Sequence, residues 1–93
     1  MITECSAAEI ERRLRERFQP SSLEVMDESA AHAGHVGAND SGSGTHFRVR
    51  ITASAFNGLS RVKQHQLLYD AVDDFFAAGL HALALQTHGE SPR

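Results

Sequence analysis

Apolar and polar residues alternate along this chain in patterns that predict two helices and three strands. In the first helix, three apolar residues recur at four-residue intervals: Ile10, Leu14 and Phe18. This spacing is typical of the buried stripe of an amphipathic helix. Ser6 and Glu9 precede the stripe with the spacing of a capping box, which satisfies free N–H groups at a helix start. Pro20 should end the helix, because the residue before a proline avoids helical backbone angles.

Two short segments indicate β-strands. Leu23, Val25 and Met26 predict a first strand, and 45–51 shows the clearest alternation in the chain. One side of this second strand is apolar and the other polar, which is the two-residue period of a half-buried strand. The apolar side holds Phe47, Val49 and Ile51, and the polar side holds His46, Arg48 and Arg50.

The segment between these strands, from Asp27 to Gly44, is rich in Gly, Ser, Ala and Asn and carries His32 and His35. A connection of this length is uncommon in a small domain and is usually functional or disordered. We therefore expect residues 28–44 to be flexible and to contribute to function.

The second half of the chain predicts a turn, a helix and a third strand. Phe56 should point inward from the turn 54–60, and Ser60 should cap a helix over 61–78. A 3-4-3-4 spacing predicts its buried stripe. The stripe comprises Val62, His65, Tyr69, Val72 and Phe76, widened by Leu68 and Phe75. Gly79 should end the helix in the left-handed conformation, and 80–86 alternates as a strand.

The predicted order α-β-β-α-β implies a two-layer α+β domain with a three-stranded mixed sheet. The strands on either side of the second helix should be parallel, and the first two antiparallel. Both helices should cover one face of the sheet and leave the other exposed. A chain of 93 residues, 41% of them hydrophobic, supports one core, so we predict a single domain over 1–93. Its ordered core should cover 6–87, with a flexible tail at 88–93.

Charge and composition narrow the classes of function. A net charge of −3 argues against a protein held mainly by phosphate backbones, which requires clustered Lys and Arg. The chain contains no apolar run of about 18 residues, the length that would predict a membrane span. No secretory signal is visible at the N-terminus. Cys5 is the only cysteine, which fits a reducing cytoplasm. No nucleophile elbow, phosphate-binding loop or spaced carboxylate pair indicates an enzyme.

Several segments, in this order and spacing, resemble the BolA family over most of the chain, from Ile10 to Thr87. They are Val25–Ser29, His32–His35, Thr45–Val49, Phe56–Ser60 and Gly79–Leu85. The resemblance implies a fold similar to a class II KH domain. It also implies a non-enzymatic partner of a monothiol glutaredoxin, which acts in the binding or trafficking of a [2Fe–2S] cluster or in iron sensing.

The resemblance places the cluster at the interface between the two proteins, with further ligands from the glutaredoxin cysteine and glutathione. On this chain it points to His81 and His32 as ligands, with His35 as the alternative to His32. Imidazole suits iron, and a neutral ligand that protonation can release would make the cluster easier to pass on to apo client proteins. Two imidazoles are too few to hold a cluster, so we expect none in the isolated chain, a monomer or weak homodimer.

The remaining histidines and Cys5 have simpler interpretations. His46 is expected at the surface of its strand, His65 partly buried and holding the turn or loop, and His88 in the tail. Cys5 precedes a helix start, where a thiolate can be activated, but a single terminal cysteine is more often incidental. Zinc or copper bound at His32 and His35, on an adaptor protein, is a further alternative.

The competing hypothesis is a KH-like, DNA-binding transcriptional regulator. Its candidate residues form a small basic strip: Arg48, Arg50, Arg61 and Lys63. Three features disfavour DNA as the partner: the negative net charge, the absence of Gly-x-x-Gly at 57–60, and glutamines on both sides of His65. The BolA family usually has Arg-His-Arg at this last position.

Overall fold

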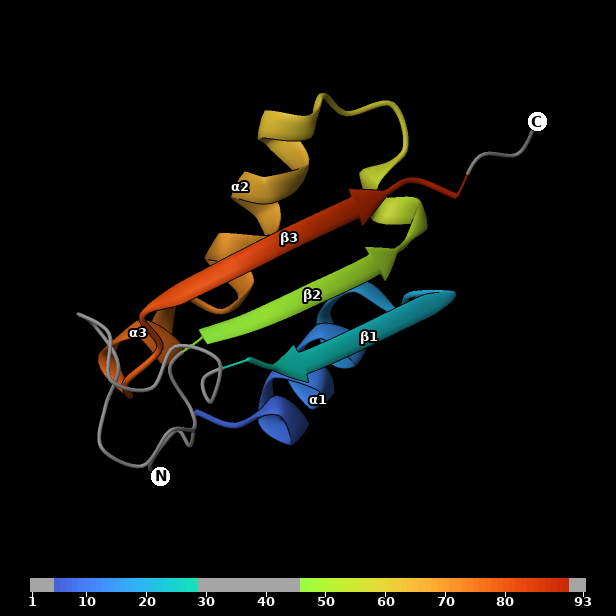
Figure 1. Cartoon of the computed structure of the whole chain (residues 1–93). Helices are drawn as coiled ribbons and strands as arrows, with labels where there is room; N and C mark the ends of the chain where they lie inside the picture. Colours follow the sequence, from blue (N-terminus) through green and yellow to red (C-terminus); the bar gives the residue numbers. More distant parts are fainter. Residues whose placement is uncertain (1–4, 29–45, 91–93) are drawn as a thin grey trace.

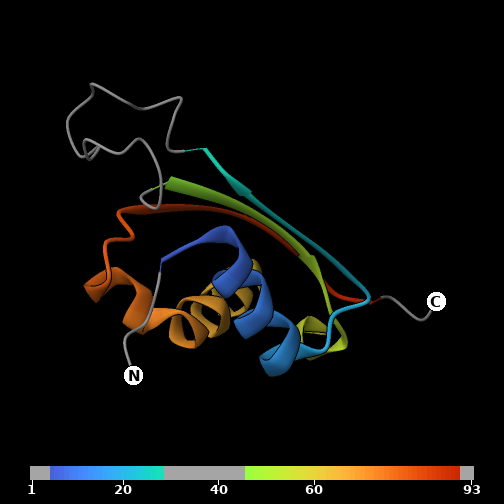
Figure 2. The same cartoon turned by 90° about the horizontal axis from the view of Figure 1, so that it is seen from below.

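Three strands form one sheet, and all the helices lie on one of its faces (Figures 1 and 2). The computed structural model describes residues 5–28 and 46–90. The predicted α+β order is confirmed, with the second helix divided in two. The elements are α1 (Ala7–Phe18), β1 (Ser22–Asp27), β2 (His46–Thr52), the 3₁₀ turn η2 (Ser54–Phe56), α2 (Arg61–Ala71), α3 (Asp73–Ala77) and β3 (Ala82–His88).

Strand β2 lies in the middle of the sheet, in the order β1-β2-β3. It pairs antiparallel with β1 and parallel with β3, as predicted. Val49 is level with Val25 on one side and with Leu85 on the other. The alternation in β2 is confirmed as well, because its three apolar side chains are buried under the helices: Phe47, Val49 and Ile51.

Strand β3 is displaced by two residues from its predicted range of 80–86. Leu80 is buried but lies outside the ladder, because its N–H donates to the carbonyl of Phe75 at 3.0 Å and closes the turn after α3. At the other end, His88 pairs with Thr52 and its carbonyl accepts from the N–H of Ala53 at 3.0 Å. His88 therefore belongs to the strand and not to the predicted tail.

The predicted helix starts are confirmed by their capping bonds. The Ser6 hydroxyl accepts from the N–H of Glu9 at 3.2 Å, and the Ser60 hydroxyl accepts from the N–H of Lys63 at 3.2 Å. Helix α1 ends at Phe18, just before Pro20, and the intervening Gln19 is left-handed with φ 49°. Each of these boundaries depends on neighbours within a few residues, which is why the sequence predicts them.

The single helix predicted over 61–78 is wrong, because the chain leaves the helical conformation at Val72. This residue has φ −119° and ψ 18°, and its N–H bonds to the carbonyl of Tyr69 at 3.2 Å in a tightened last turn. Both Val72 and Phe75 are buried. The interruption changes the direction of the chain, and α3 then places its own residue, Phe75, in the core.

The predicted buried stripe of this region is confirmed only in part: Leu68, Val72 and Phe75 are buried, but three other members are not. Val62 is 76% exposed, and Tyr69 and Phe76 are each 39% exposed. Ala71, which was not part of the predicted stripe, is buried beside the three confirmed residues. The predicted stripe is thus wider than the buried face, and the way the helices lie on the sheet decides which part of it is covered.

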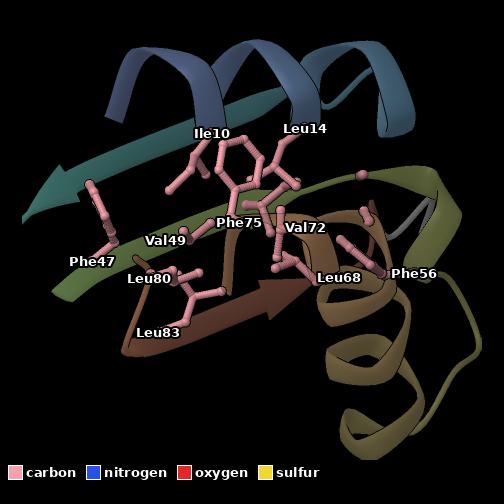
Figure 3. Close-up of a cluster of buried hydrophobic side chains, with 13 residues drawn as sticks. Ile10, Leu14, Phe47, Val49, Phe56, Leu68, Val72, Phe75, Leu80 and Leu83 are labelled. Carbon is pink, nitrogen blue, oxygen red and sulfur yellow. The ribbon is translucent and has the colours of Figure 1, made fainter. Parts of the chain in front are cut away.

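The core fills the space between the helices and the sheet (Figure 3). Ile10 and Leu14 enter from α1, as predicted, and meet side chains from β2, α2, α3 and β3. Phe56 points inward from η2 and is fully buried, which confirms its expected position, and the ring of Phe18 lies 5.1 Å from its ring. One turn residue is thus part of the main core.

An ion pair joins the first and last helices at the edge of this core. The guanidinium of Arg13 donates to both carboxylate oxygens of Asp74, at 2.6 and 2.9 Å, and to the carbonyl of Ala71 at 2.9 Å. The central carbon of this guanidinium, Cζ, lies 4.8 Å from the ring centre of Phe75. The hydrogen bonds to Asp74 hold the pKa of Arg13 above its ordinary value. Because two bonds fix the relative orientation of the two groups, this pair sets how α1 and α3 meet.

The difference between the buried and the exposed face of α2 can be measured with adjacent leucines. Leu68 is fully buried, whereas Leu67 is 39% exposed. Leu68→Ala should lower the free energy of unfolding by about 2–5 kcal/mol, because it leaves a cavity in the core. Leu67→Ala should cost less than about 1 kcal/mol, because little apolar surface returns to water. Urea unfolding followed by circular dichroism measures both changes, and equal losses would contradict the described packing.

Candidate functional site

His81 lies at one end of the sheet, directly before β3, with its side chain exposed. The turn after α3 places it there. Gly79 has φ 119°, a conformation that side chains other than hydrogen rarely allow, and the chain then anchors Leu80 in the core. Since Leu80 points inward, His81 is turned towards solvent. Its imidazole is therefore available to a ligand or partner.

A second imidazole lies against His81. The rings of His46 and His81 are 5.3 Å apart and tilted by 50°. The parallel register causes this proximity, because His46 is level with Ala82, the residue that follows His81. The expected surface position of His46 is only partly correct, since its side chain is half-buried. The sequence did contain a signal for this pair, because a histidine lies at the start of each of two strands that were expected to be parallel.

The long segment between β1 and β2 starts and ends at this same end of the sheet. The residues that bracket it, Glu28 and His46, are joined by a hydrogen bond of 2.8 Å from the N–H of Glu28 to the carbonyl of His46. His32 and His35 lie outside the described residues. The structure therefore gives the position of His81, whereas the ligand role of all three histidines stays a prediction.

No group of three or more His, Cys, Asp or Glu side chains suited to a metal ion occurs within 5–28 and 46–90. The described part of the chain thus presents the pair His46 and His81 but no complete set of metal ligands. What these two imidazoles can offer chemically is one or two nitrogen ligands to a metal whose other ligands come from elsewhere.

The four residues of the expected basic strip do not lie together. Arg48 and Arg50 are on the open face of the sheet, and each faces a carboxylate. Arg48 donates to Glu28 at 2.9 Å, which raises the pKa of Arg48, and Arg50 lies 3.6 Å from Glu24. Arg61 and Lys63 belong instead to the first turn of α2. The local positive charge on the open face is largely offset by these carboxylates.

The other end of β3 lines an open cavity of ≈ 470 Å³ together with Arg61 and His65. The half-buried His65 contributes to its wall, but the neighbouring Gln64 holds the turn, a role we expected of His65. The Gln64 amide donates to the carbonyls of Phe56 and Leu59, at 3.2 and 3.1 Å, and its oxygen accepts from Thr87 at 2.7 Å. Gln64 thus connects the turn, α2 and β3.

Comparison with known proteins gives the family. The model of the family described as BolA-like protein matches residues 14–91. The chain belongs to the BolA-like family. It is 47% identical over 77 residues to an uncharacterized protein in the cobS 5′ region of Sinorhizobium, with 83% of each chain covered. The solved BolA domain of SufE1 from Arabidopsis thaliana has a TM-score of 0.80 and 39% identity, covering 90% of this chain and 91% of that one.

The BolA-like domain occurs in proteins of different lengths and names. This chain is 45% identical over 80 residues to SufE-like protein 1, chloroplastic/mitochondrial, of Arabidopsis thaliana; the match covers 82% of this chain but only 21% of that protein. It is 39% identical over 79 residues to the protein of Escherichia coli (strain K12) named DNA-binding transcriptional regulator BolA, covering 85% and 70%. Family membership alone therefore does not select one function. No described helix of this BolA-like chain is long and apolar enough to cross a membrane.

The environment of Cys5 in this BolA-like domain disfavours the thiolate, the reactive form of its side chain. The side chain is half-buried against the core, and burial raises the pKa of its thiol. The negative charge of Asp27 raises it further. Because the thiolate is the reactive form, a raised pKa makes the thiol less reactive at neutral pH.

We therefore predict that Cys5 reacts with iodoacetamide several-fold more slowly in the folded chain at pH 7.5 than in the urea-unfolded chain. Asp27→Asn should raise the rate in the folded chain, because it removes the charge that disfavours the thiolate. Mass spectrometry of timed samples measures both rates. A folded-state rate equal to or above the unfolded rate would show that the thiol is not suppressed.

Proposed function

We propose that this chain is a non-enzymatic partner of a monothiol glutaredoxin that helps to bind a [2Fe–2S] cluster at their shared interface. The resemblance to the BolA family suggests this role, and the observation that carries it on this chain is the exposed imidazole of His81 at the end of the sheet. A ligand shared with another protein must be accessible, and His81 meets this condition. The cluster is cargo, to be passed to apo client proteins or used in iron sensing.

His81 and His32 would be the two ligands from this chain, with His35 as the alternative to His32. Four residues extend at most about 14 Å when fully stretched, so connectivity keeps His32 within that distance of Glu28. Glu28 and His46 are hydrogen-bonded to each other, and the ring of His46 lies against that of His81. This supports a common site for a loop histidine and His81.

The glutaredoxin cysteine and glutathione would complete the ligand set. Two imidazoles from this chain are too few to hold a cluster, so the cluster would be held only in the complex. Imidazole nitrogen suits iron, and its protonation can weaken the bond and favour release. We propose the reducing cytoplasm as the compartment, since the single Cys5 cannot form an internal disulfide.

His46 would act as a positioning residue in this site. Its half-buried ring lies 5.3 Å from that of His81 and restricts the directions in which the exposed ring can turn. A ligand that is held in place loses less conformational entropy on binding. His46 would thus affect how firmly the cluster is held without being a ligand itself.

The test is to co-express the chain with a monothiol glutaredoxin in the presence of glutathione and to record visible absorption and circular dichroism. The complex should be coloured, and the isolated chain colourless. His81→Ala should remove or strongly change the visible dichroism. His88→Ala is the matched control, because His88 is also an exposed histidine of this part of the chain but lies at the far end of β3.

Comparison of His32→Ala with His35→Ala then identifies the loop ligand, since only the ligand variant should change the spectrum. An unchanged spectrum for His81→Ala would show that His81 is not a ligand. A complex that never forms, with an otherwise folded chain, would reject the glutaredoxin partnership.

The second candidate is a DNA-binding regulator, which the name of the Escherichia coli relative favours. The carboxylates beside Arg48 and Arg50 weaken this proposal. We therefore expect no shift of double-stranded DNA in a gel at about 0.15 M salt, and at most weak binding at lower salt, because nonspecific DNA binding falls steeply as salt rises. A sequence-specific shift at the higher salt would reverse the order of the two candidates.

A further inference from the structure

Strand β3 ends the sheet, so one of its edges faces away from β2. In a parallel ladder, the N–H and C=O of one residue point to the same edge of the strand, and those of the next residue point to the opposite edge. The carbonyl of His88 faces β2, where it accepts from Ala53. The carbonyl of Leu83 faces outward, where it accepts from the hydroxyl of Tyr69 at 3.3 Å. The residues of β3 whose backbone N–H and C=O point outward, away from β2, are therefore Leu83, Leu85 and Thr87.

Tyr69 covers only the first part of this edge. Among the described residues, no side chain or loop donates to or accepts from the outward backbone groups of Leu85 and Thr87; the side chain of Thr87, not its backbone, bonds to Gln64. Proteins usually block a free strand edge, because it can pair with another chain. The edge of β3 is thus bonded near its start, whereas near its end the outward backbone groups have no hydrogen-bond partner among the described residues, with Leu85 half-buried and Thr87 9% exposed.

The cavity of ≈ 470 Å³ follows this last part of the edge. Four consecutive residues of β3, Leu85–His88, line it. Since successive side chains of a strand point to opposite faces, a wall of four consecutive residues includes the backbone edge between them. The opposite wall comes from Arg61 and His65, one turn apart near the start of α2, whose first turns lie beyond the outer edge of β3 (Figure 1).

The charge of this groove is positive. Arg61 is exposed and has no carboxylate partner among the described residues, and no Asp or Glu lines the groove. Five other arginines are paired with carboxylates: Arg12, Arg13, Arg15, Arg48 and Arg50. Arg17, on α1, shares the exposure of Arg61 and has no carboxylate partner among the described residues, but it lies outside the groove. The imidazoles of His65 and His88 add two further groups able to donate hydrogen bonds to an anion.

We propose that this groove binds an extended, acidic segment of a partner protein, which adds to β3 as a fourth strand. Backbone bonds to Leu85 and Thr87 would supply affinity, and a carboxylate of the segment against Arg61 would supply selectivity. The groove lies at the far end of β3 from His81, about 20 Å along a seven-residue strand. The site is therefore separate from the proposed cluster site, and both could be occupied together.

The test uses the ¹⁵N-labelled full chain and a peptide of six alternating Glu and Val residues with blocked ends. On binding, the amides of Leu85 and Thr87 should shift and become protected against hydrogen exchange. The amides of Ala84 and Gln86 should keep the protection they already have, because these residues face β2. A peptide in which Lys replaces each Glu should bind at least tenfold more weakly.

Two matched variants test the charge. Arg61→Glu should weaken binding of the acidic peptide by about tenfold or more, the effect of losing one hydrogen bond to a charged group. Arg17→Glu makes the same change of charge at an exposed position of α1 and should leave binding unaltered. Leu85→Pro should abolish binding by removing an outward N–H, and thermal unfolding shows whether that variant is folded. If Leu85→Pro does not fold, Arg61→Glu still tests the proposal.

The proposal is overturned if the acidic peptide does not bind, or if the Lys peptide binds as well. It is overturned too if inorganic phosphate shifts the groove residues while the acidic peptide gives no protection at Leu85 and Thr87, which would indicate a small-anion site. Binding of a single-stranded oligonucleotide in place of the peptide would identify the groove as a nucleic-acid site. His81→Ala should leave peptide binding unchanged, so failure here is distinct from failure of the glutaredoxin proposal.

Discussion

The position of β2 between two partners is the constraint on which the rest of the structure depends. Its buried face supplies Phe47, Val49 and Ile51 to the core, and its two edges determine the registers of β1 and β3. A slip of one residue in either register would turn an entire set of apolar side chains to the wrong face. The hydrophobic core therefore determines, indirectly, which functional residues lie next to each other across the sheet.

The two ends of the sheet acquire different chemistry from this arrangement. Parallel pairing of β2 and β3 brings His46 and His81 together at one end, where an imidazole is exposed. At the other end, the strand edge, Arg61 and His65 surround a groove without carboxylates. The open face between them carries arginines paired with glutamates. The two sites that we propose thus lie at opposite ends of β3.

Local signals predicted much of the fold because their causes are local. The caps at Ser6 and Ser60 depend on residues three positions away, and the alternation in β2 depends on a pleat with a period of two. The exposed position of His81 also follows from its immediate neighbours. The pairing of His81 with His46 does not, because it requires the register between strands 35 residues apart in the chain.

By itself, the sequence determined the element order, the mixed sheet and the inward position of Phe56, through turn chemistry and hydrophobic periodicity. Tertiary structure decided which part of the predicted apolar stripe is buried, where the helix breaks at Val72, and that Arg13 pairs with Asp74. The physical reason is that burial and ion pairing depend on residues distant in sequence. An apolar stripe that is wider than the covered face leaves its buried part undetermined until a neighbouring surface packs against it.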